Sequence, residues 1–200
     1  KRRKEILRER NQIKHQFIRV EILEGNDIGS EHIFIMYQFY LSTIYKKWGQ
    51  LYLTEDFFLR IYEKMRKRLL LILAYDRDGD CVAGSINFLK GDNLYGRYWG
   101  CKRDYKSLHF ELCYYQPIEY AIRKGIKLFE AGAQGDHKIK RGFLPELTYS
   151  AHWLENKEFR YSISNFLVGE KEAICKGFEA FRPHSPYREK CPSLSDGDLS

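Results

Sequence analysis

Two stretches of the sequence gather side chains that can move protons or bind a substrate. The first is His109–Gln116, in which Glu111 and Tyr115 are four residues apart. On a helix that spacing places a carboxylate and a phenol on one face, where they can line the same cavity. A buried carboxylate beside aromatic rings can serve as a general base. An equally weighted alternative is that Glu111 forms a salt bridge with a lysine or arginine across the sheet.

The second stretch is Gly132–Phe143, which combines glycines with cationic side chains. Glycine lets a backbone approach a ligand closely, and an imidazole at His137 offers a second candidate base. Lys138, Arg141 and the loop amides are candidates for stabilising an oxyanion. A plain surface turn is the competing interpretation. We therefore predict Glu111 and His137 as catalytic, with a substrate-binding set of Tyr98, Trp99, His109, Tyr114, Tyr115, Gln134, Gly135, Lys138, Arg141 and His152.

Metal and thiol chemistry have weaker support in the sequence. His109, His137 and His152 lack the i, i+4 spacing of a helical zinc pair. The five cysteines are odd in number and include no Cys-x-x-Cys pair, so a disulfide framework is not expected. We predict no metal, and a cytoplasmic location in a reducing compartment.

The net charge of +7 is mostly local. Residues 1–14 hold seven Lys and Arg against two Glu, which leaves the other 186 residues nearly neutral. A second basic cluster spans Arg60–Arg68, where cations suit the end of a helix. Binding of tRNA or another nucleic acid through these basic helices is an alternative function that the charge distribution does not favour. The sequence contains no run of eighteen apolar residues, so it predicts no membrane span.

Periodicity predicts an α/β fold with one mixed central sheet and helices on both of its faces. Thr54 and Asn156 are predicted helix N-caps. Pro117 interrupts one helical pattern, so that the helix either kinks or begins its regular part there. The predicted strands are 17–23, 69–75, 82–88, 94–99, 126–131 and 147–154, and the predicted helices are 30–48, 55–68, 109–124 and 157–181.

These elements predict a single domain over residues 16–183, preceded by a basic helical connector (1–15) and followed by a loosely ordered tail (184–200). Strands 94–99 and 126–131 should run parallel, joined by helix 109–124. Ligands collect at the carboxyl ends of such strands, which points to residues 99–115 and 130–142. We expect the two strands to diverge there and leave a cleft.

The same stretches resemble the FemAB-like, peptidoglycan-biosynthesis-related family of the GNAT acyltransferase superfamily. The resemblance covers about residues 80–185. It rests on Tyr95–Gly100, His109–Gln116, Ile118–Ile122, Gly132–Gly135, His137-Lys138, Arg141–Phe143 and Thr148–Trp153.

The resemblance implies a GNAT-like sheet and transfer of an acyl or aminoacyl group to an amine, with a cell-wall precursor as the acceptor. Family members resemble two acyltransferase-like halves, which implies that this chain is the C-terminal half and that the N-terminal half of a longer chain is its partner. Acyl-CoA and aminoacyl-tRNA are the two donors implied. Cys101–Ser107 lacks the glycine-rich turn that wraps a coenzyme A pyrophosphate in the superfamily. A non-catalytic half with a structural or interaction role is therefore the alternative.

Overall fold

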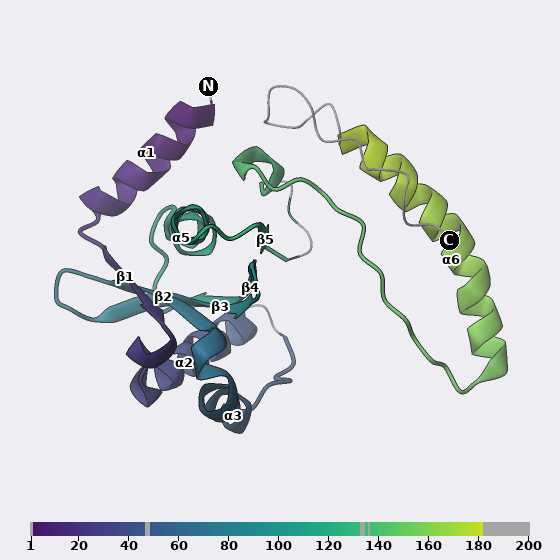
Figure 1. Ribbon diagram of the computed structural model, residues 1–200, viewed down its shortest axis with the longest axis horizontal. Helices are drawn as coiled ribbons and strands as arrows, with labels where there is room; N and C mark the ends of the chain where they lie inside the picture. The colour runs from purple at the N-terminus through teal and green to yellow at the C-terminus, as the bar shows by residue number, and fades with distance from the viewer. Residues whose placement is uncertain (1, 47–48, 133–134, 136, 182–200) are drawn as a thin grey trace. The chain divides into compact units, whose positions relative to one another are not determined.

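The computed structural model describes residues 2–46, 49–132, 135 and 137–181 (Figure 1). The internal contacts of the chain divide it into two units, Lys1–Ala133 and Gln134–Ser200. The sequence predicted one domain over 16–183, whereas this division falls just after the last strand. The tail 184–200 lies outside the described residues.

The described part of the first unit contains a five-stranded sheet in the order β1-β2-β3-β4-β5. The first four strands are antiparallel neighbours, and β5 pairs with β4 in parallel. This arrangement confirms the predicted mixed sheet and its parallel pair. The strands are β1 (Arg19–Glu24), β2 (Leu69–Tyr75), β3 (Cys81–Lys90), β4 (Asn93–Cys101) and β5 (Leu128–Glu130).

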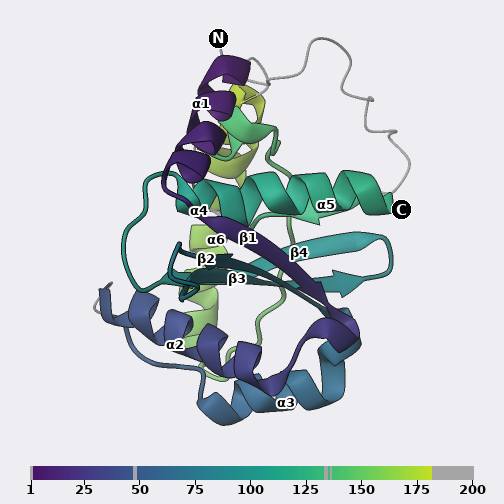
Figure 2. The same cartoon turned by 90° about the vertical axis from the view of Figure 1, so that its left-hand side faces the viewer.

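Helices cover both faces of this sheet (Figure 2). One face carries α2 (Ser30–Lys46) and α3 (Glu55–Met65), and the other carries α1 (Arg2–His15) and the helical segment that ends in α5 (Gln116–Lys124). The central strand β2 is an unbroken apolar run because side chains on both of its faces are buried. Burial of that surface is the main stabilising contribution to the fold.

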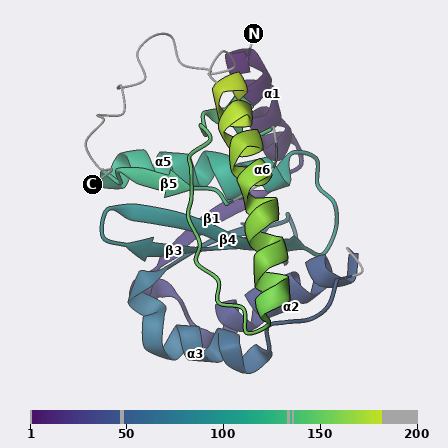
Figure 3. The same cartoon turned by 90° about the vertical axis from the view of Figure 1, so that its right-hand side faces the viewer.

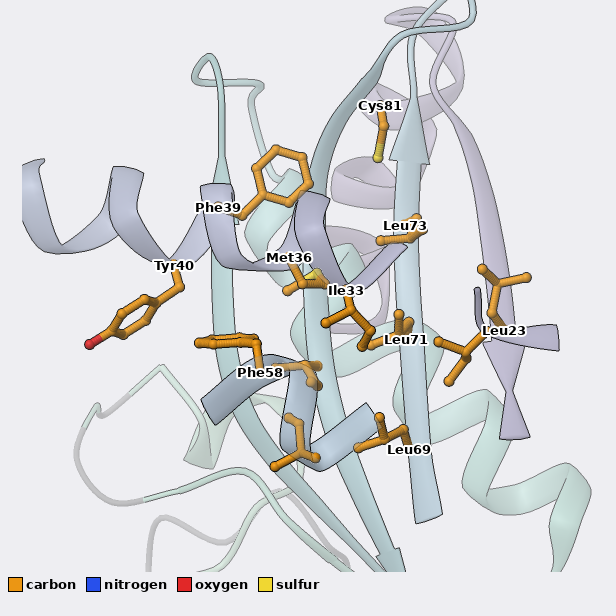
Figure 4. Close-up of a cluster of buried hydrophobic side chains, with 13 residues drawn as sticks. Leu23, Ile33, Met36, Phe39, Tyr40, Phe58, Leu69, Leu71, Leu73 and Cys81 are labelled. Atoms are coloured by element: carbon orange, nitrogen blue, oxygen red, sulfur yellow. The ribbon is translucent and has the colours of Figure 1, made fainter. Parts of the chain in front are cut away.

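The larger core cluster lies between the sheet and the α2–α3 layer (Figure 4). Alternate residues of β2 point into it, and α2 contributes one side chain about every turn. Thr54 begins α3 as predicted, since its hydroxyl accepts a hydrogen bond from the Phe57 amide at 3.3 Å. The labelled members of the cluster are Leu23, Ile33, Met36, Phe39, Tyr40, Phe58, Leu69, Leu71, Leu73 and Cys81.

The helical segment after β4 changes its pitch because of a proline. It begins as α4 (Leu108–Phe110), widens into a π-helical segment η3 (Glu111–Tyr115) and becomes regular as α5, where Pro117 occupies the first turn. A π-helix bonds each carbonyl to the amide five residues ahead. For the Leu112 carbonyl that residue is Pro117, which has no N–H to donate.

Ser85 on β3 supplies the missing donor. Its hydroxyl donates a 3.0 Å hydrogen bond to the Leu112 carbonyl, and the serine itself is buried. A buried carbonyl without a partner is costly, so one hydroxyl of the sheet compensates for the proline. The regular helix therefore begins at the proline, which is one of the two outcomes predicted for it.

This compensation predicts a non-additive pair of substitutions. Ser85→Ala should lower the free energy of unfolding by about 1–3 kcal/mol, because it leaves the buried Leu112 carbonyl unpaired. In a Pro117→Ala background the new amide can bond that carbonyl, and the cost of Ser85→Ala should fall. Urea denaturation of the wild type, both single variants and the double variant measures the coupling. Strictly additive effects would contradict the assignment.

The first helix packs onto the sheet through its last turns. Ile13 of α1 is 4% exposed and lies in a core cluster with Ile72 of β2 and Leu112 of η3. The predicted helix over residues 1–15 is thus present, and its buried side chain belongs to the core of the first unit. Its outer residues are exposed and largely basic.

The second unit contains a short 3₁₀ turn η4 (Ile139–Arg141) and the long helix α6 (Lys157–Phe181), seen in Figure 3. Asn156 begins α6 as predicted, since its side-chain oxygen accepts from the Phe159 amide at 2.9 Å. The predicted strand 147–154 is wrong: these residues are extended but form no ladder. Alternating apolar residues make a strand only when another strand supplies hydrogen bonds, and Tyr149 and Trp153 remain exposed here.

Candidate functional site

The parallel strands β4 and β5 separate after three residue pairs. The paired residues run from Asn93–Leu128 to Tyr95–Glu130, and β5 ends there while β4 continues to Cys101. A bulge near Arg97 shifts the register between β3 and β4 in the same region. Bulges bend a strand and increase its twist. The parallel pairing ends at Tyr95 and Glu130, as the predicted divergence requires, and the cleft between the two strands stays a prediction.

We call residues 99–101 of β4, on the side facing away from β3, the open edge. The Lys102 amide donates to the Val82 carbonyl of β3 at 2.8 Å. Backbone groups of successive residues in a strand point to opposite sides. The N–H and C=O groups of Trp99 and Cys101 therefore point away from β3, into the region that β5 does not reach.

Helix α2 provides hydrogen-bond donors to the carbonyls of the open edge. The Thr43 hydroxyl donates to the Trp99 carbonyl at 2.8 Å, and the Ser42 hydroxyl donates to the Cys101 carbonyl at 3.2 Å. Sequence analysis missed both residues, because on sequence alone two hydroxyls in an amphipathic helix are ordinary surface or helix-internal positions. Only the packing of α2 on β4 shows what they bond.

Gly100 lets α2 come this close to the strand. A Cβ built at Gly100 would lie 2.0 Å from the Phe39 carbonyl oxygen, which is backbone and cannot rotate away. At Gly84, in β3, the nearest atom to such a Cβ is the flexible Met36 sulfur at 2.6 Å. The closest approach of helix to sheet is thus set by one glycine at the open edge.

These two glycines give a matched pair of substitutions. Gly100→Ala should destabilise the fold strongly, by roughly 3 kcal/mol or more, because it forces the α2 backbone off β4. Gly84→Ala should cost less, about 1–2 kcal/mol, since Met36 can change rotamer. Thermal and urea unfolding of both variants check the order. If the two variants were equally stable, the close packing of α2 on the open edge would be refuted.

Three of the predicted binding residues meet beside the open edge. The His109 ring lies 5.1 Å from the Trp99 ring and 5.5 Å from the Tyr114 ring, centroid to centroid, with Phe110 against both His109 and Tyr114. Edge-on packing of this kind orients aromatic rings. The cluster joins β4 to α4, which carries His109, and to the widened segment η3, which carries Tyr114. The turn that precedes the widening therefore brings an imidazole to the strand whose edge is open.

Tyr98 lies on the opposite face of β4 from Trp99, because neighbouring side chains of a strand alternate. Its ring packs on Tyr40 and Phe58, and its hydroxyl is 3.4 Å from that of Tyr52. Burial, followed by the neighbouring phenol, raises the pKa of Tyr98 to about 12. Tyr98 is therefore a neutral phenol on the α2–α3 side of the sheet. The structure does not bring it to the His109 cluster.

Glu111 forms a salt bridge, as its alternative role predicted, but the partner is Arg10 of α1 on the same face of the sheet and not a cation across the sheet. Arg10 donates to its two carboxylate oxygens at 3.1 and 3.3 Å, and Gln116 donates at 2.7 Å. Glu111 is 4% exposed. Arg10 also bonds Glu119 of α5, with one contact at 3.0 Å. Arg10 is thus shared by two carboxylates, that of Glu111 in η3 and that of Glu119 in α5.

The sequence predicts that Glu111 and Tyr115 line the same cavity, but in the structure both side chains bond residues of α1. The Tyr115 hydroxyl hydrogen-bonds the Glu9 carboxylate of α1, while Glu111 bonds Arg10. Both groups therefore hold α1 against η3. The sequence carried no periodic signal for this, because Glu9 and Arg10 are a hundred residues away and sit in a run of charges that reads as a solvated face.

Removing Arg10 should lower the free energy of unfolding much more than removing its exposed partner Glu119. Arg10→Met leaves the buried Glu111 carboxylate without its cation and should cost about 3 kcal/mol of stability. Glu119→Gln should cost less than about 1 kcal/mol, because the Glu119 side chain is 52% exposed. Urea denaturation at neutral pH separates the two. Equal losses would mean that the buried pair contributes no more than the exposed one.

The exposed partner should also respond to acid. The Arg10 hydrogen bond lowers the pKa of Glu119 from its usual value of 4.5. A carboxyl whose pKa is lowered on folding stabilises the protein above its unfolded pKa and loses that contribution as the pH falls through its folded pKa. The stability of Glu119→Gln should therefore fall less than that of the wild type between about pH 5 and pH 3. Parallel pH curves would rule this out.

The loop before α4 is held by the end of α1. Gln16 donates to the Lys106 carbonyl and accepts from the Lys106 amide, both at 3.0 Å, and Ser107 donates to Gln12 at 2.9 Å. Ser107 has a left-handed backbone with φ of 66°. These contacts place two glutamine side chains on the loop before α4, within the segment Cys101–Ser107 that lacks the glycine-rich turn of the superfamily it resembles.

A cysteine, a lysine and an aspartate meet where β4 ends. Lys46 of α2 lies 3.7 Å from the Cys101 sulfur and 3.1 Å from an Asp104 oxygen. Burial raises the pKa of the Cys101 thiol. The thiol is therefore protonated near neutral pH, which does not suit a nucleophile. Within the part of the chain that the structure describes, no group of three or more His, Cys, Asp or Glu side chains could hold a metal ion.

The remaining predicted site residues belong to the second unit. The Arg141 guanidinium donates to the His137 carbonyl at 2.9 Å, and Lys138 begins η4. His152 is exposed and bonds the Ser150 hydroxyl at 2.9 Å. Gly135 has a positive φ of 105°, which suits glycine. Gln134 lies outside the described residues. Their sharing a site with the first unit remains a prediction.

Among the helices of the described ranges, none combines the length and the apolar composition that crossing a bilayer requires.

Solved structures share this fold at low sequence identity. The structure of L-PGS from Bacillus licheniformis matches with a TM-score of 0.50 and 10% identity, over 66% of this chain and 41% of that chain. An aminoglycoside acetyltransferase, meta-AAC0020, from an uncultured soil metagenomic sample in complex with trehalose matches with a TM-score of 0.50 and 12% identity, over 72% and 99%. The GNAT-like fold class is thereby confirmed. The chain spans less than half the length of L-PGS.

A search of curated proteins finds no match. A family model, in contrast, covers almost the whole chain. The model describes FemAB-like proteins of peptidoglycan biosynthesis and recognition, and it matches residues 1–189. That range includes α1, the open edge of β4, the His109 cluster and the glycine-rich loop. The chain belongs to the FemAB-like family.

Proposed function

We propose that this chain is an acyltransferase domain that passes an acyl or aminoacyl group to an amine, with a cell-wall precursor as the acceptor. The observation that carries the proposal is the open edge of β4 beside the His109–Trp99–Tyr114 cluster. The membership in the FemAB-like family supports the cell-wall acceptor. The acetyltransferase fold supports the reaction type.

The proposed reaction uses the backbone of β4 to hold the donor carbonyl. The amide groups of Trp99 and Cys101 point into the region where β5 has ended, and an N–H directed at a carbonyl oxygen stabilises the negative charge that develops on it. The amine nitrogen bonds to the acyl carbon and loses a proton to a base. The bond from the acyl carbon to the donor then breaks, and the leaving group takes up a proton.

His109 is the base candidate that the first unit supports best. Its imidazole is held against Trp99, the residue whose amide lies on the open edge. Imidazole exchanges a proton near neutral pH. Glu111 is less suited, because protonating it would break its bonds with Arg10 and Gln116. His137 stays a second candidate base in the other unit, with Lys138 and Arg141 as candidate oxyanion donors.

The donor is proposed to lack a coenzyme A pyrophosphate. By resemblance, that group would bind at the loop before α4, and Gln12 and Gln16 of α1 already hydrogen-bond this loop at Lys106 and Ser107. Aminoacyl-tRNA is then the favoured donor of the two that the resemblance implies. Cys81, Cys101 and Cys175 are free thiols, which supports the proposed cytoplasmic location.

A transfer assay with matched variants tests this proposal. His109→Gln should lower transfer of an activated amino acid to a cell-wall precursor amine at least about hundredfold, since general-base catalysis contributes about 10²–10⁴. Glu111→Gln should instead act mainly on stability. Full activity of His109→Gln would overturn the assignment of His109, and full activity of His137→Gln as well would leave neither histidine as the base.

One specific observation favours a second function, that of a non-catalytic half. The bonds of Glu111 and Tyr115 to α1 consume two side chains that could have done chemistry. Calorimetric titration with acetyl-CoA and with a nonhydrolysable aminoacyl-adenosine ester analogue separates the two functions. An acyltransferase of the proposed kind binds the ester analogue and not acetyl-CoA, whereas a structural half gives no heat with either.

A further inference from the structure

We propose that Thr43 and Ser42 of α2 are positioning residues that keep the edge of β4 open and make it an edge of hydrogen-bond donors. That ligands use this edge rests on the proposed function. The two hydroxyls bond the carbonyls of Trp99 and Cys101 and leave the N–H groups of these residues directed outward.

A parallel strand could extend along β4 only by using its carbonyls as well as its amides. Parallel pairing takes both the N–H and the C=O of every second residue. On the open edge those residues are Trp99 and Cys101, whose carbonyls already accept from α2. The hydroxyls therefore compete with strand pairing at the residues where β5 has ended, and they help to keep the two strands apart beyond Tyr95 and Glu130.

The same arrangement sets which ligand atoms fit. Two amides on one side of a strand are two residues apart, or about 7 Å. An edge with amides directed away from β3 and occupied carbonyls matches a group that presents oxygen acceptors, such as an ester carbonyl. It matches a peptide strand less well, because the N–H groups of that strand would have to share each carbonyl with a hydroxyl of α2.

Thr43 carries more of this role than Ser42. The Thr43 hydroxyl has the shorter bond to the strand, at 2.8 Å. The Ser42 hydroxyl also bonds the Phe39 carbonyl of its own helix, at 2.8 Å, so that its contact with Cys101 is shared. The close approach at Gly100 fixes the separation at which both hydroxyls can reach the strand.

Amide exchange and carbonyl chemical shifts, measured by NMR on the purified chain, test the proposal without an activity assay. In the wild type, the Trp99 and Cys101 amides should exchange at least about tenfold faster than the Gly100 amide, which points to β3. Thr43→Val keeps the side-chain volume but removes the donor, so the Trp99 carbonyl resonance should shift upfield. Thr43→Ser restores the donor and should restore the resonance.

Thr54→Val is the matched control. It also removes a threonine hydroxyl and lowers stability, since Thr54 caps α3, but it should leave the Trp99 carbonyl resonance unchanged. Equal shifts in the Thr43 and Thr54 variants, or slow exchange of the Trp99 and Cys101 amides in the wild type, would overturn the proposal. In a transfer assay, kcat should fall in Thr43→Val and recover in Thr43→Ser. If the amides exchange as expected but the chain transfers no acyl group, the proposed function is wrong while the role of Thr43 and Ser42 at the edge of β4 still holds.

Discussion

The first unit is organised around the backbone hydrogen bonds of β4 beyond the end of β5. Polar backbone groups inside a fold need partners, and on this stretch one side of the strand is paired with β3 while the other has lost its neighbouring strand. Helix α2 supplies donors for the carbonyls at Trp99 and Cys101. The two carbonyls of β4 that lie beyond the last β5 pair therefore have partners, and the proposed ligand region begins at this edge.

A second compensation operates on the other face of the sheet. Pro117 removes a donor from the helical segment, the segment widens over Glu111–Tyr115, and Ser85 bonds the Leu112 carbonyl. His109 of α4, just before the widened segment, packs on Trp99 of β4 and on Tyr114 of η3. Helix α1 then fixes the same segment from outside through Arg10 and its two carboxylates. The proposed acyl site thus depends on contacts between segments that are far apart in sequence.

The sequence predicted the sheet and helices well where periodicity and local chemistry agree. The buried run of β2, the Thr54 cap and the parallel crossover to β5 are examples, because each depends on neighbouring residues. The strand predicted over 147–154 failed for the opposite reason, since its pattern is local while the hydrogen bonds of a strand come from a partner. Whether Glu111 is a base or an ion-pair partner could not be predicted from its neighbours, because its partner Arg10 lies 101 residues away in the sequence.

The sequence by itself determined which segments are amphipathic, where helices begin, that His109 and Trp99 flank one loop, and that the chain resembles the FemAB-like family. Tertiary structure alone decided that Thr43 and Ser42 bond the edge of β4, that Tyr98 faces away from His109, and that Glu111 is an ion-paired anchor. The reason is the range of the interactions. Turns, caps and periodicity are encoded within a few residues, whereas backbone partners and ion pairs across the fold exist only once packing has fixed their distances.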